Sequence, residues 1–480
     1  MQQTKLIATL RSLSPRERSR WQAWVNSDFF NKNRRLRQLC ALVLDHAPGF
    51  ESPELDKPRV FTALWDAETP YDELALNNLI SDLLELLHGF LAYQQSESRP
   101  LEKQLDLADA LLRRDLDKSA MTVLDKTRKQ LDEAPERSFY WLKTDLHWWE
   151  LREALHSRQS RQAADDFLLR QADDTDLLLV LEKLRLACTM LSRNTLAVAK
   201  ADFAPRWLDS LLQWCVEEPL LATHPAVGAY LAVLDLLAKP GAASYARLTA
   251  VLEANEAIFP TQELATLYQY ALNYCIRRIN DGEPEAHREA LSLYQTLLDK
   301  NLLLRDGHLS QWTYKNITTA GLRCREFGWT EQFLHRYRDY LPPADRDNAH
   351  AYNLAVLHFE QEHYAEALRA LLGVEFTDFT YHLGAKIIQL KIYYLLGEQD
   401  ALSALLDATA KLIRRNRSLS AYGKTANLNF LAILRHISRH KPTPARRNSA
   451  VKNMKKAALM QKIQAMQPLA NKDWLLAAAL

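Results

Sequence analysis

Residues 349–372 (AHAYNLAVLHFEQEHYAEALRALL) constrain the fold more than any other part of this 480-residue chain. Leu354, Leu368 and Leu371 recur at helical spacing on either side of a short polar turn. Ala355 and Ala367 are small, as two helices joined by a tight turn require at their closest approach. Such a hairpin leaves one apolar face uncovered, so the segment predicts an array of stacked helical hairpins.

This pattern resembles the tetratricopeptide repeat family in its leading Leu, its two small positions and its turn aromatic Tyr364. The resemblance implies an α-solenoid. Fainter hairpins are predicted at 107–127, 264–298, 312–340 (hinged at Gly328) and 387–413 (turning at Gly397). Three phrases, VNSDFFNKNRRLRQL near the start, YYLLGEQDALSALL with LIRRNRSLS near the end, and the closing DWLL, resemble a group of bacterial tetratricopeptide-like proteins without an assigned function.

Few glycines and long amphipathic runs predict an all-α chain, because only 12 of its residues are glycine. We expect an irregular, right-handed, tetratricopeptide-like α-solenoid at 101–440, preceded by a helical domain at 1–95. A basic capping helix is expected at 441–480, and Trp474 with Leu475 is expected to plug its end. No strand of alternating β-branched residues is predicted.

The head, residues 1–95, begins with a strong helix signal. Ser14, Pro15 and Glu17 have the spacing of a capping box with proline at the first helical position. A dense aromatic cluster follows, and the polar segment 94–100 ends in proline and is the predicted linker. The cluster comprises Trp21, Trp24, Phe29 and Phe30, with Val25 among them.

The five cysteines are dispersed, lack CxxC spacing and lie mostly at apolar helix positions. They are typical of buried thiols in a reducing compartment. The amino terminus has no apolar signal-peptide core, and no 18-residue apolar run occurs in the chain. A cytoplasmic protein without a transmembrane segment is expected.

The sequence contains no phosphate-binding loop, GxGxxG or HExxH motif. The nearest approach to a metal set is HFEQEH, in which His358 and Glu362 are four residues apart. Its second half falls in the expected turn, which favours a packed histidine over a metal site. We expect no enzymatic activity, no cofactor and no metal.

The inner side of the best hairpin is the predicted binding groove, formed by Tyr352, Val356, Phe359 and Glu360. Repeats that clamp the carboxylate of a peptide have Lys and Asn at such positions, whereas this sequence has Tyr352 and Val356. An apolar helix or an extended segment is therefore the expected ligand. Packing of the same four residues against an adjacent helix is the competing interpretation.

Charge is distributed unevenly along the chain. Residues 38–407 hold 37 Lys and Arg against 56 acids, a net charge of −19, whereas residues 408–472 hold fifteen Lys and Arg and no acid. This basic segment is a candidate for binding nucleic acid, an anionic membrane, an acidic protein or the acidic body of the chain. The candidate anion-binding residues are Arg414, Arg415, Arg417, Arg446, Arg447, Lys452, Lys455 and Lys456.

Two functions follow from these patterns. The first is a non-catalytic scaffold or adaptor that holds a protein partner, or a second copy of itself, in a helical-repeat groove. The alternative is a nucleic-acid-binding regulator that uses the basic segments at the two ends, including Arg34, Arg35 and Arg37.

Overall fold

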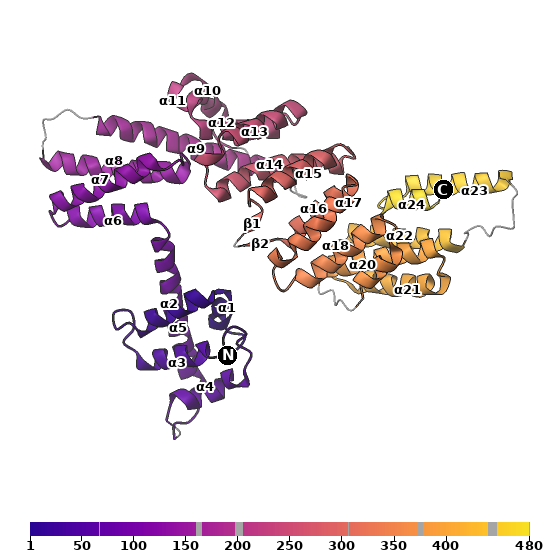
Figure 1. The fold of residues 1–480 in the computed structure, drawn as a ribbon, viewed down its shortest axis with the longest axis horizontal. Helices are drawn as coiled ribbons and strands as arrows, with labels where there is room; N and C mark the ends of the chain where they lie inside the picture. Colours follow the sequence, from indigo (N-terminus) through magenta and orange to yellow (C-terminus); the bar gives the residue numbers. More distant parts are fainter. Residues whose placement is uncertain are drawn as a thin grey trace. The chain divides into compact units, whose positions relative to one another are not determined.

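A computed structural model describes residues 1–66, 68–159, 166–196, 205–305, 307–372, 378–439 and 449–479, without the side chains of 159, 195, 196 and 449–456. The predicted all-α class is confirmed, since 78% of the model is helical and it contains 24 α-helices in its described residues (Figure 1). Among the described residues, the exception to the strand-free prediction is a short antiparallel pair, β1 (Leu304–Arg305) and β2 (His308–Leu309).

The chain forms two compact units. The first contains Met1–Lys183 and Trp207–Val227, and the second contains Leu184–Arg206 and Gly228–Leu480. The predicted boundaries near residues 95–101 and 441 stay predictions, because they lie within units rather than between them.

The head in the first unit has its own core. Its helices are α1 (Lys5–Ser12), α2 (Pro15–Asn26), α3 (Arg34–Leu44), α4 (Lys57–Leu64) and α5 (Glu73–Glu97), with a 3-10 turn at Pro53–Leu55. The capping box at Ser14 and Glu17 is present at the start of α2. One cluster of buried residues from Met1 to Phe90 joins all five helices, so the head packs largely on itself.

The predicted linker is mostly helix. Residues 94–97 form the last turn of α5, and α6 (Pro100–Leu112) begins after only Ser98 and Arg99. The polar residues of segment 94–100 predicted a linker, but a solvent-exposed helix end can be polar as well, because it needs no apolar residues.

The rest of the first unit is also helical. It contains α6, α7 (Asp117–Glu133), α8 (Phe139–Gln159), the beginning of α9 (Phe167–Leu196), α10 (Leu208–Glu217), α11 (Pro219–Thr223) and the beginning of α12 (Pro225–Ala238). A second buried cluster, from Leu105 to Leu155, lies between α6, α7 and α8. Trp148 is part of it and donates a hydrogen bond of 2.8 Å to the carbonyl of Leu124.

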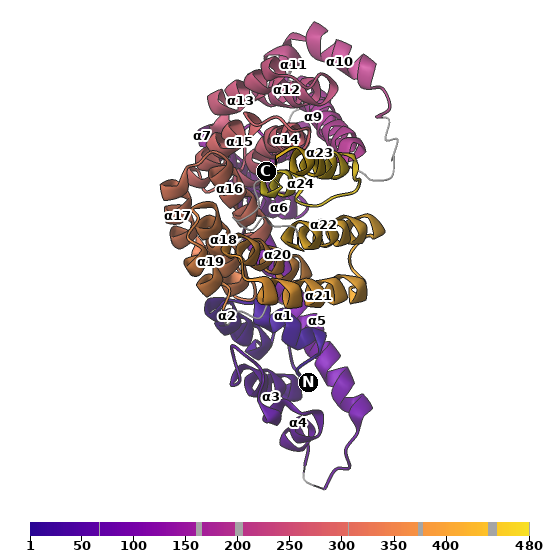
Figure 2. The ribbon, with the colours of Figure 1, turned by 90° about the vertical axis from the view of Figure 1, so that its right-hand side faces the viewer.

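The second unit continues from the ends of α9 and α12 as a series of helices. They are α13 (Ala242–Ala254), α14 (Thr261–Asn280), α15 (Ala286–Asp299), α16 (Gln311–Arg323), α17 (Phe327–Arg336), α18 (Arg346–Glu360), α19 (Tyr364–Ala370), α20 (Phe379–Leu396), α21 (Gln399–Arg415), α22 (Ala421–Arg439), α23 (Ser449–Ala465) and α24 (Lys472–Ala478). Short 3-10 turns lie at Glu256–Ile258 and Arg338–Tyr340. Consecutive helices from α13 to α19 and from α20 to α22 pack on one another, and α16, α18 and α20 also lie side by side (Figure 2).

The same turn closes five hairpins. In each, one residue adopts a left-handed conformation, and the N–H of the next residue bonds to the carbonyl five positions back at 2.8–3.0 Å. This is the hydrogen-bond pattern of a Schellman motif, which satisfies carbonyls at a helix end. The hairpins are α6–α7, α14–α15, α16–α17, α18–α19 and α20–α21, with left-handed residues Asp115, Gly282, Arg325, Glu362 and Gly397 respectively.

Buried residues recur at fixed distances from that turn in four of the hairpins. The positions seven before and five after the left-handed residue lie on the two helices of the hairpin and are at most 1% exposed. These pairs are Ala108 with Ala120, Thr318 with Thr330, Ala355 with Ala367, and Leu390 with Leu402. The alanine pair predicted at 355/367 is therefore buried, and Ala108 with Ala120 occupies the same positions in the hairpin predicted at 107–127.

The hinge predicted at Gly328 is wrong by three residues. Gly328 lies inside α17, and the left-handed residue of that turn is Arg325, with φ of 60°. The glycine this hairpin does need is Gly321, because a Cβ there would lie 2.2 Å from Oγ1 of Thr330. Close helix approach, rather than the turn, explains that glycine.

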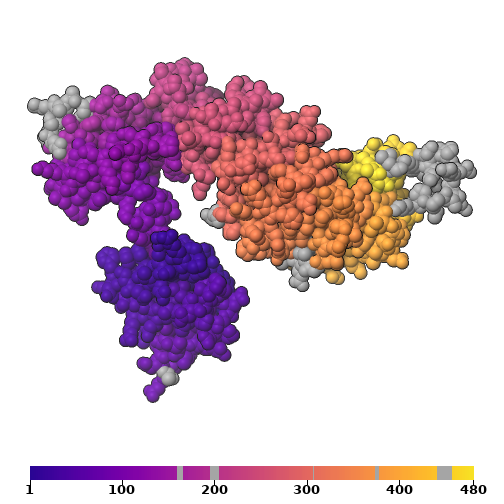
Figure 3. All heavy atoms as spheres, viewed as in Figure 1, coloured from indigo at the N-terminus to yellow at the C-terminus, as the bar shows by residue number. Residues whose placement is uncertain are grey.

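The carboxyl-terminal helices belong to the core of the second unit. Ile463 of α23 and Leu475 of α24 are fully buried in a cluster with residues of α20, α21 and α22. Trp474 contacts the rings of Tyr394 at 5.7 Å and Phe430 at 6.2 Å. The plug predicted from Trp474 and Leu475 is therefore confirmed, and Figure 3 shows the yellow end against the orange helices.

Candidate functional site

The four predicted groove residues lie along α18. Tyr352, Val356 and Phe359 are half-buried, and Glu360 is exposed. The three apolar side chains pack against a cluster that includes Ala385, Ile388 and Ile392 of α20. The structure therefore places most of the predicted groove in the contact between α18 and α20, which was the competing interpretation, and leaves only its edge accessible.

Tyr352 fits this contact because α20 has a glycine opposite it. A Cβ on Gly384 would lie 2.7 Å from the Tyr352 ring, so any larger residue would displace the tyrosine. The Tyr352 ring meets Tyr381 edge to face at 5.0 Å. Tyr381 in turn donates a hydrogen bond of 3.0 Å to the carbonyl of Gln311, at the start of α16. Tyr381 of α20 thus contacts both Tyr352 of α18 and the first residue of α16.

Lys315 of α16 extends its ammonium group over these rings. Its Nζ lies 5.7 Å from the centre of Tyr352 and 5.9 Å from those of Tyr381 and Trp312. Burial lowers the pKa of Lys315, and the carboxylate of Asp378 offsets only part of that effect. No ion pair joins this ammonium to a carboxylate of the described residues.

Lys391 of α20 occupies a similar setting about two helical turns away. Its Nζ donates a hydrogen bond of 2.8 Å to Oδ1 of Asn471 and lies 5.3 Å from the ring of Trp474 and 5.8 Å from that of Phe359. Burial lowers its pKa to about 8, Glu360 opposes the shift and Arg323 adds to it. Here too, the part of the chain that is described supplies no paired carboxylate.

We call this set the lysine–aromatic face: Lys315, Tyr352, Phe359, Tyr381, Lys391 and Trp474. Buried ammonium groups without a counter-ion are costly, and rings only partly replace the lost water. The face can therefore bind an anion by direct charge pairing. Neither lysine is among the site residues predicted from the sequence, although Lys391 stands alone in the apolar run IIQLKIYYLL, which is a usable signal.

The predicted anion-binding residues of the basic segment are only partly described. Arg414 and Arg415 end α21 and are exposed, as is Arg417 just beyond it. Arg446 and Arg447 lie outside the described residues. Lys452, Lys455 and Lys456 belong to α23, but their side chains lie outside the described part of the chain. Anion binding by this segment stays a prediction.

The head presents a second surface, which contains part of the predicted aromatic cluster. The loop between α2 and α3 exposes Phe29 to 87%, and Phe30 stacks on Trp24. Asn31 holds this loop in place: it donates to the carbonyl of Val25 at 2.8 Å and accepts from the N–H of Asn33 at 2.8 Å. The aromatic side chains are therefore displayed by a preorganised loop.

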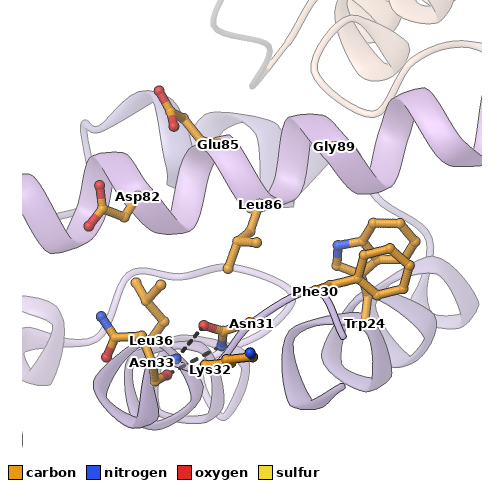
Figure 4. A pocket seen from close by; sticks show the side chains of 10 residues that line it. All are labelled: Trp24, Phe30, Asn31, Lys32, Asn33, Leu36, Asp82, Glu85, Leu86 and Gly89. Atoms are coloured by element: carbon orange, nitrogen blue, oxygen red, sulfur yellow. Dashed lines mark hydrogen bonds between the residues drawn. The ribbon is translucent and has the colours of Figure 1, made fainter. Parts of the chain in front are cut away.

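An open cleft of about 480 Å³ lies beside that loop (Figure 4). Phe30 and Trp24 form one wall, Leu36 and Leu86 another, and Gly89 of α5 leaves open space where a side chain would project. Large exposed aromatic groups beside a cleft are typical of interaction surfaces.

Replacing Phe29 with alanine is expected to leave the stability of the head unchanged, within about 0.5 kcal/mol, because its side chain is exposed. Val25→Ala, on the same helix–loop segment but fully buried, should cost about 2 kcal/mol. Urea unfolding monitored by tryptophan fluorescence measures both. Equal destabilisation by the two variants would show that Phe29 is a core residue.

Within the described residues, no group of three or more His, Cys, Asp or Glu side chains is arranged to hold a metal. No helix in the same residues is both long and apolar enough to span a bilayer. In comparisons with known proteins, no family model and no curated protein matches the chain.

Proposed function

We propose that this chain is a non-catalytic interaction protein whose second unit is a tetratricopeptide-like array that holds a protein partner. The lysine–aromatic face carries the proposal, because α16, α18 and α20, the first helices of three successive hairpins, each contribute to it and its edge at Trp312 is exposed. A binding surface built from several repeats is how such arrays recognise extended ligands.

The recurring turn supports the repeat interpretation. A Schellman turn with buried residues seven positions before and five after it defines one unit, and the hairpins α16–α17, α18–α19 and α20–α21 follow one another directly. Helices α23 and α24 then serve as the cap that covers the last apolar face, through Ile463 and Leu475.

Site-specific photo-cross-linking tests this function. A benzoylphenylalanine at Trp312, which is 44% exposed at the edge of the face, is expected to form adducts with a protein partner in the cells that make this chain. The same group at Tyr422 of α22, which is 72% exposed and away from these lysines in sequence, is the matched control. Failure of position 312 to capture any protein, including a second copy, would contradict the proposal.

A further inference from the structure

The two lysines of the lysine–aromatic face define what kind of segment fits there. Each ammonium lies over aromatic rings and lacks an ion pair within the described residues. Desolvating a cation without a partner costs free energy that a bound carboxylate returns, since charge-assisted hydrogen bonds are among the strongest in proteins. The face therefore has two ammonium groups and no carboxylate paired with either of them in the described residues.

The spacing of the lysines sets the spacing of the ligand's charges. Lys315 contacts Tyr352 and Lys391 contacts Phe359, and these rings are seven residues apart on α18. At a rise of 1.5 Å per residue this separates them by about 10 Å. A segment in the polyproline II conformation rises about 3.1 Å per residue with three residues per turn, so it covers about the same distance in three residues and returns to the same face. Acidic side chains at positions i and i+3 of such an extended segment therefore lie on one side, at about the separation of the two rings.

The rings supply the apolar part of the site. Trp312 stacks on Tyr381 at 5.7 Å and remains 44% exposed, so it offers a flat surface beside Lys315. Residues 311–400 hold nine Lys and Arg against twelve acids, so this part of the chain lacks the excess of basic residues that a long polyanion such as RNA requires. A short acidic segment needs only the two lysines.

We propose that the lysine–aromatic face binds an extended acidic segment of a partner protein, with carboxylates three residues apart on Lys315 and Lys391 and apolar side chains against Trp312 and Tyr352. This proposal rests on the proposed function, because it assigns the chemistry of the partner at the same site. It assigns Glu360 a place at the rim, where its charge selects against additional acidic groups beside Lys391.

Fluorescence anisotropy with the full chain tests the proposal. The probe is a labelled 12-residue peptide with Glu at every third position and Leu or Phe between, and its control has Gln in place of each Glu. The acidic peptide should bind at least ten-fold more tightly. The double variant Lys315→Gln and Lys391→Gln should lose about ten- to hundred-fold in affinity, as expected for two charge-assisted contacts.

Lys411→Gln, which removes an exposed lysine of α21, is the matched control and should leave the affinity unchanged. Lys315→Gln alone provides a second variant, because Lys315 makes no hydrogen bond among the described residues that its loss would break. Circular dichroism and the thermal midpoint check that each variant is folded.

Several results would overturn this inference. Equal affinity for the Glu and Gln peptides, no binding of the Glu peptide, or a Glu-peptide affinity that the lysine variants leave intact would each do so. Tighter binding of a 12-nucleotide single-stranded RNA, lost in the same variants, would replace the acidic segment by nucleic acid. If Trp312 still cross-links to a protein in any of these cases, the proposed function stands and only the assigned chemistry falls.

Discussion

Replacing Leu475 with alanine is expected to lower the free energy of unfolding of the second unit by about 2–5 kcal/mol. Leu475 is fully buried in the cluster formed by α20, α21 and α22, although it lies only four residues from the end of the described chain. Helix α24 has seven residues, which is too short to be stable alone, so its structure depends on this packing.

The consequences of that substitution extend beyond stability. Tyr394 donates a hydrogen bond of 3.0 Å to the carbonyl of Ala478, and Asn429 donates one of 2.8 Å to that of Pro468. These contacts hold the segment only while α24 is docked. Leu475→Ala should therefore accelerate tryptic cleavage after Lys472, which limited proteolysis with mass spectrometry measures.

Leu396→Ala is the matched control for Leu475→Ala. Leu396 is the last residue of α20 and is 52% exposed, so its truncation should change stability by about 0.5 kcal/mol or less. Unchanged stability and unchanged cleavage in Leu475→Ala would show that α24 is not part of the core.

The carboxyl-terminal plug was predictable from the sequence because it depends on composition alone. A Trp-Leu-Leu run after a basic, polar segment has few alternatives to burial. The best hairpin was predictable for a similar reason. Its small residues, Ala355 and Ala367, stand at fixed distances from a polar turn, and helix packing requires small residues at those positions.

Turns without glycine were harder to place. Asp115, Arg325 and Glu362 all adopt left-handed conformations that glycine would adopt at lower cost. A non-glycine residue in this conformation costs about 1–2 kcal/mol. The two hydrogen bonds of each Schellman turn offset that cost, so residues other than glycine are tolerated there. Prediction from glycine therefore placed the turn at Gly397 correctly but misplaced the turn of the 312–340 hairpin at Gly328.

The lysine–aromatic face could not be assembled from the sequence. Lys315 and Lys391 are 76 residues apart, and only the side-by-side packing of α16, α18 and α20 brings both to the rings of α18. Periodicity marks apolar positions, whereas a lysine within an apolar run is ambiguous. Its aliphatic stem packs like a hydrophobic residue, and its charge can reach the surface. Whether the ammonium group of such a lysine is buried or reaches the surface depends on the side chains that neighbouring helices place around it.

Lys391→Met is expected to stabilise the protein at pH 7. The pKa of the Lys391 ammonium falls from an ordinary 10.5 to about 8 because the group is buried, which corresponds to on the order of 3 kcal/mol. Methionine fills a similar volume without charge. It loses the 2.8 Å hydrogen bond to Asn471 and the contacts with Trp474 and Phe359, so a net gain of about 1–3 kcal/mol is expected.

The effect should depend on pH with a definite sign. Below pH 8 both the folded and the unfolded chain carry the proton, and the full cost of the buried charge is present. Between pH 8 and 10.5 the folded state releases the proton first, so the wild-type protein gains stability relative to the variant as pH rises. The advantage of Lys391→Met should therefore shrink across this range and disappear above it.

Urea unfolding of the wild type and of Lys391→Met at pH 7, 9 and 10.5 measures this difference, and Lys411→Met is the control that should show none. The same variant should bind the acidic peptide weakly while being more stable, which separates loss of an anion-binding charge from loss of structure. A variant that is destabilised by the same amount at all three pH values would mean that the Lys391 ammonium is well paired in the folded protein. An acidic segment of a partner would then find no unpaired ammonium to bind at Lys391.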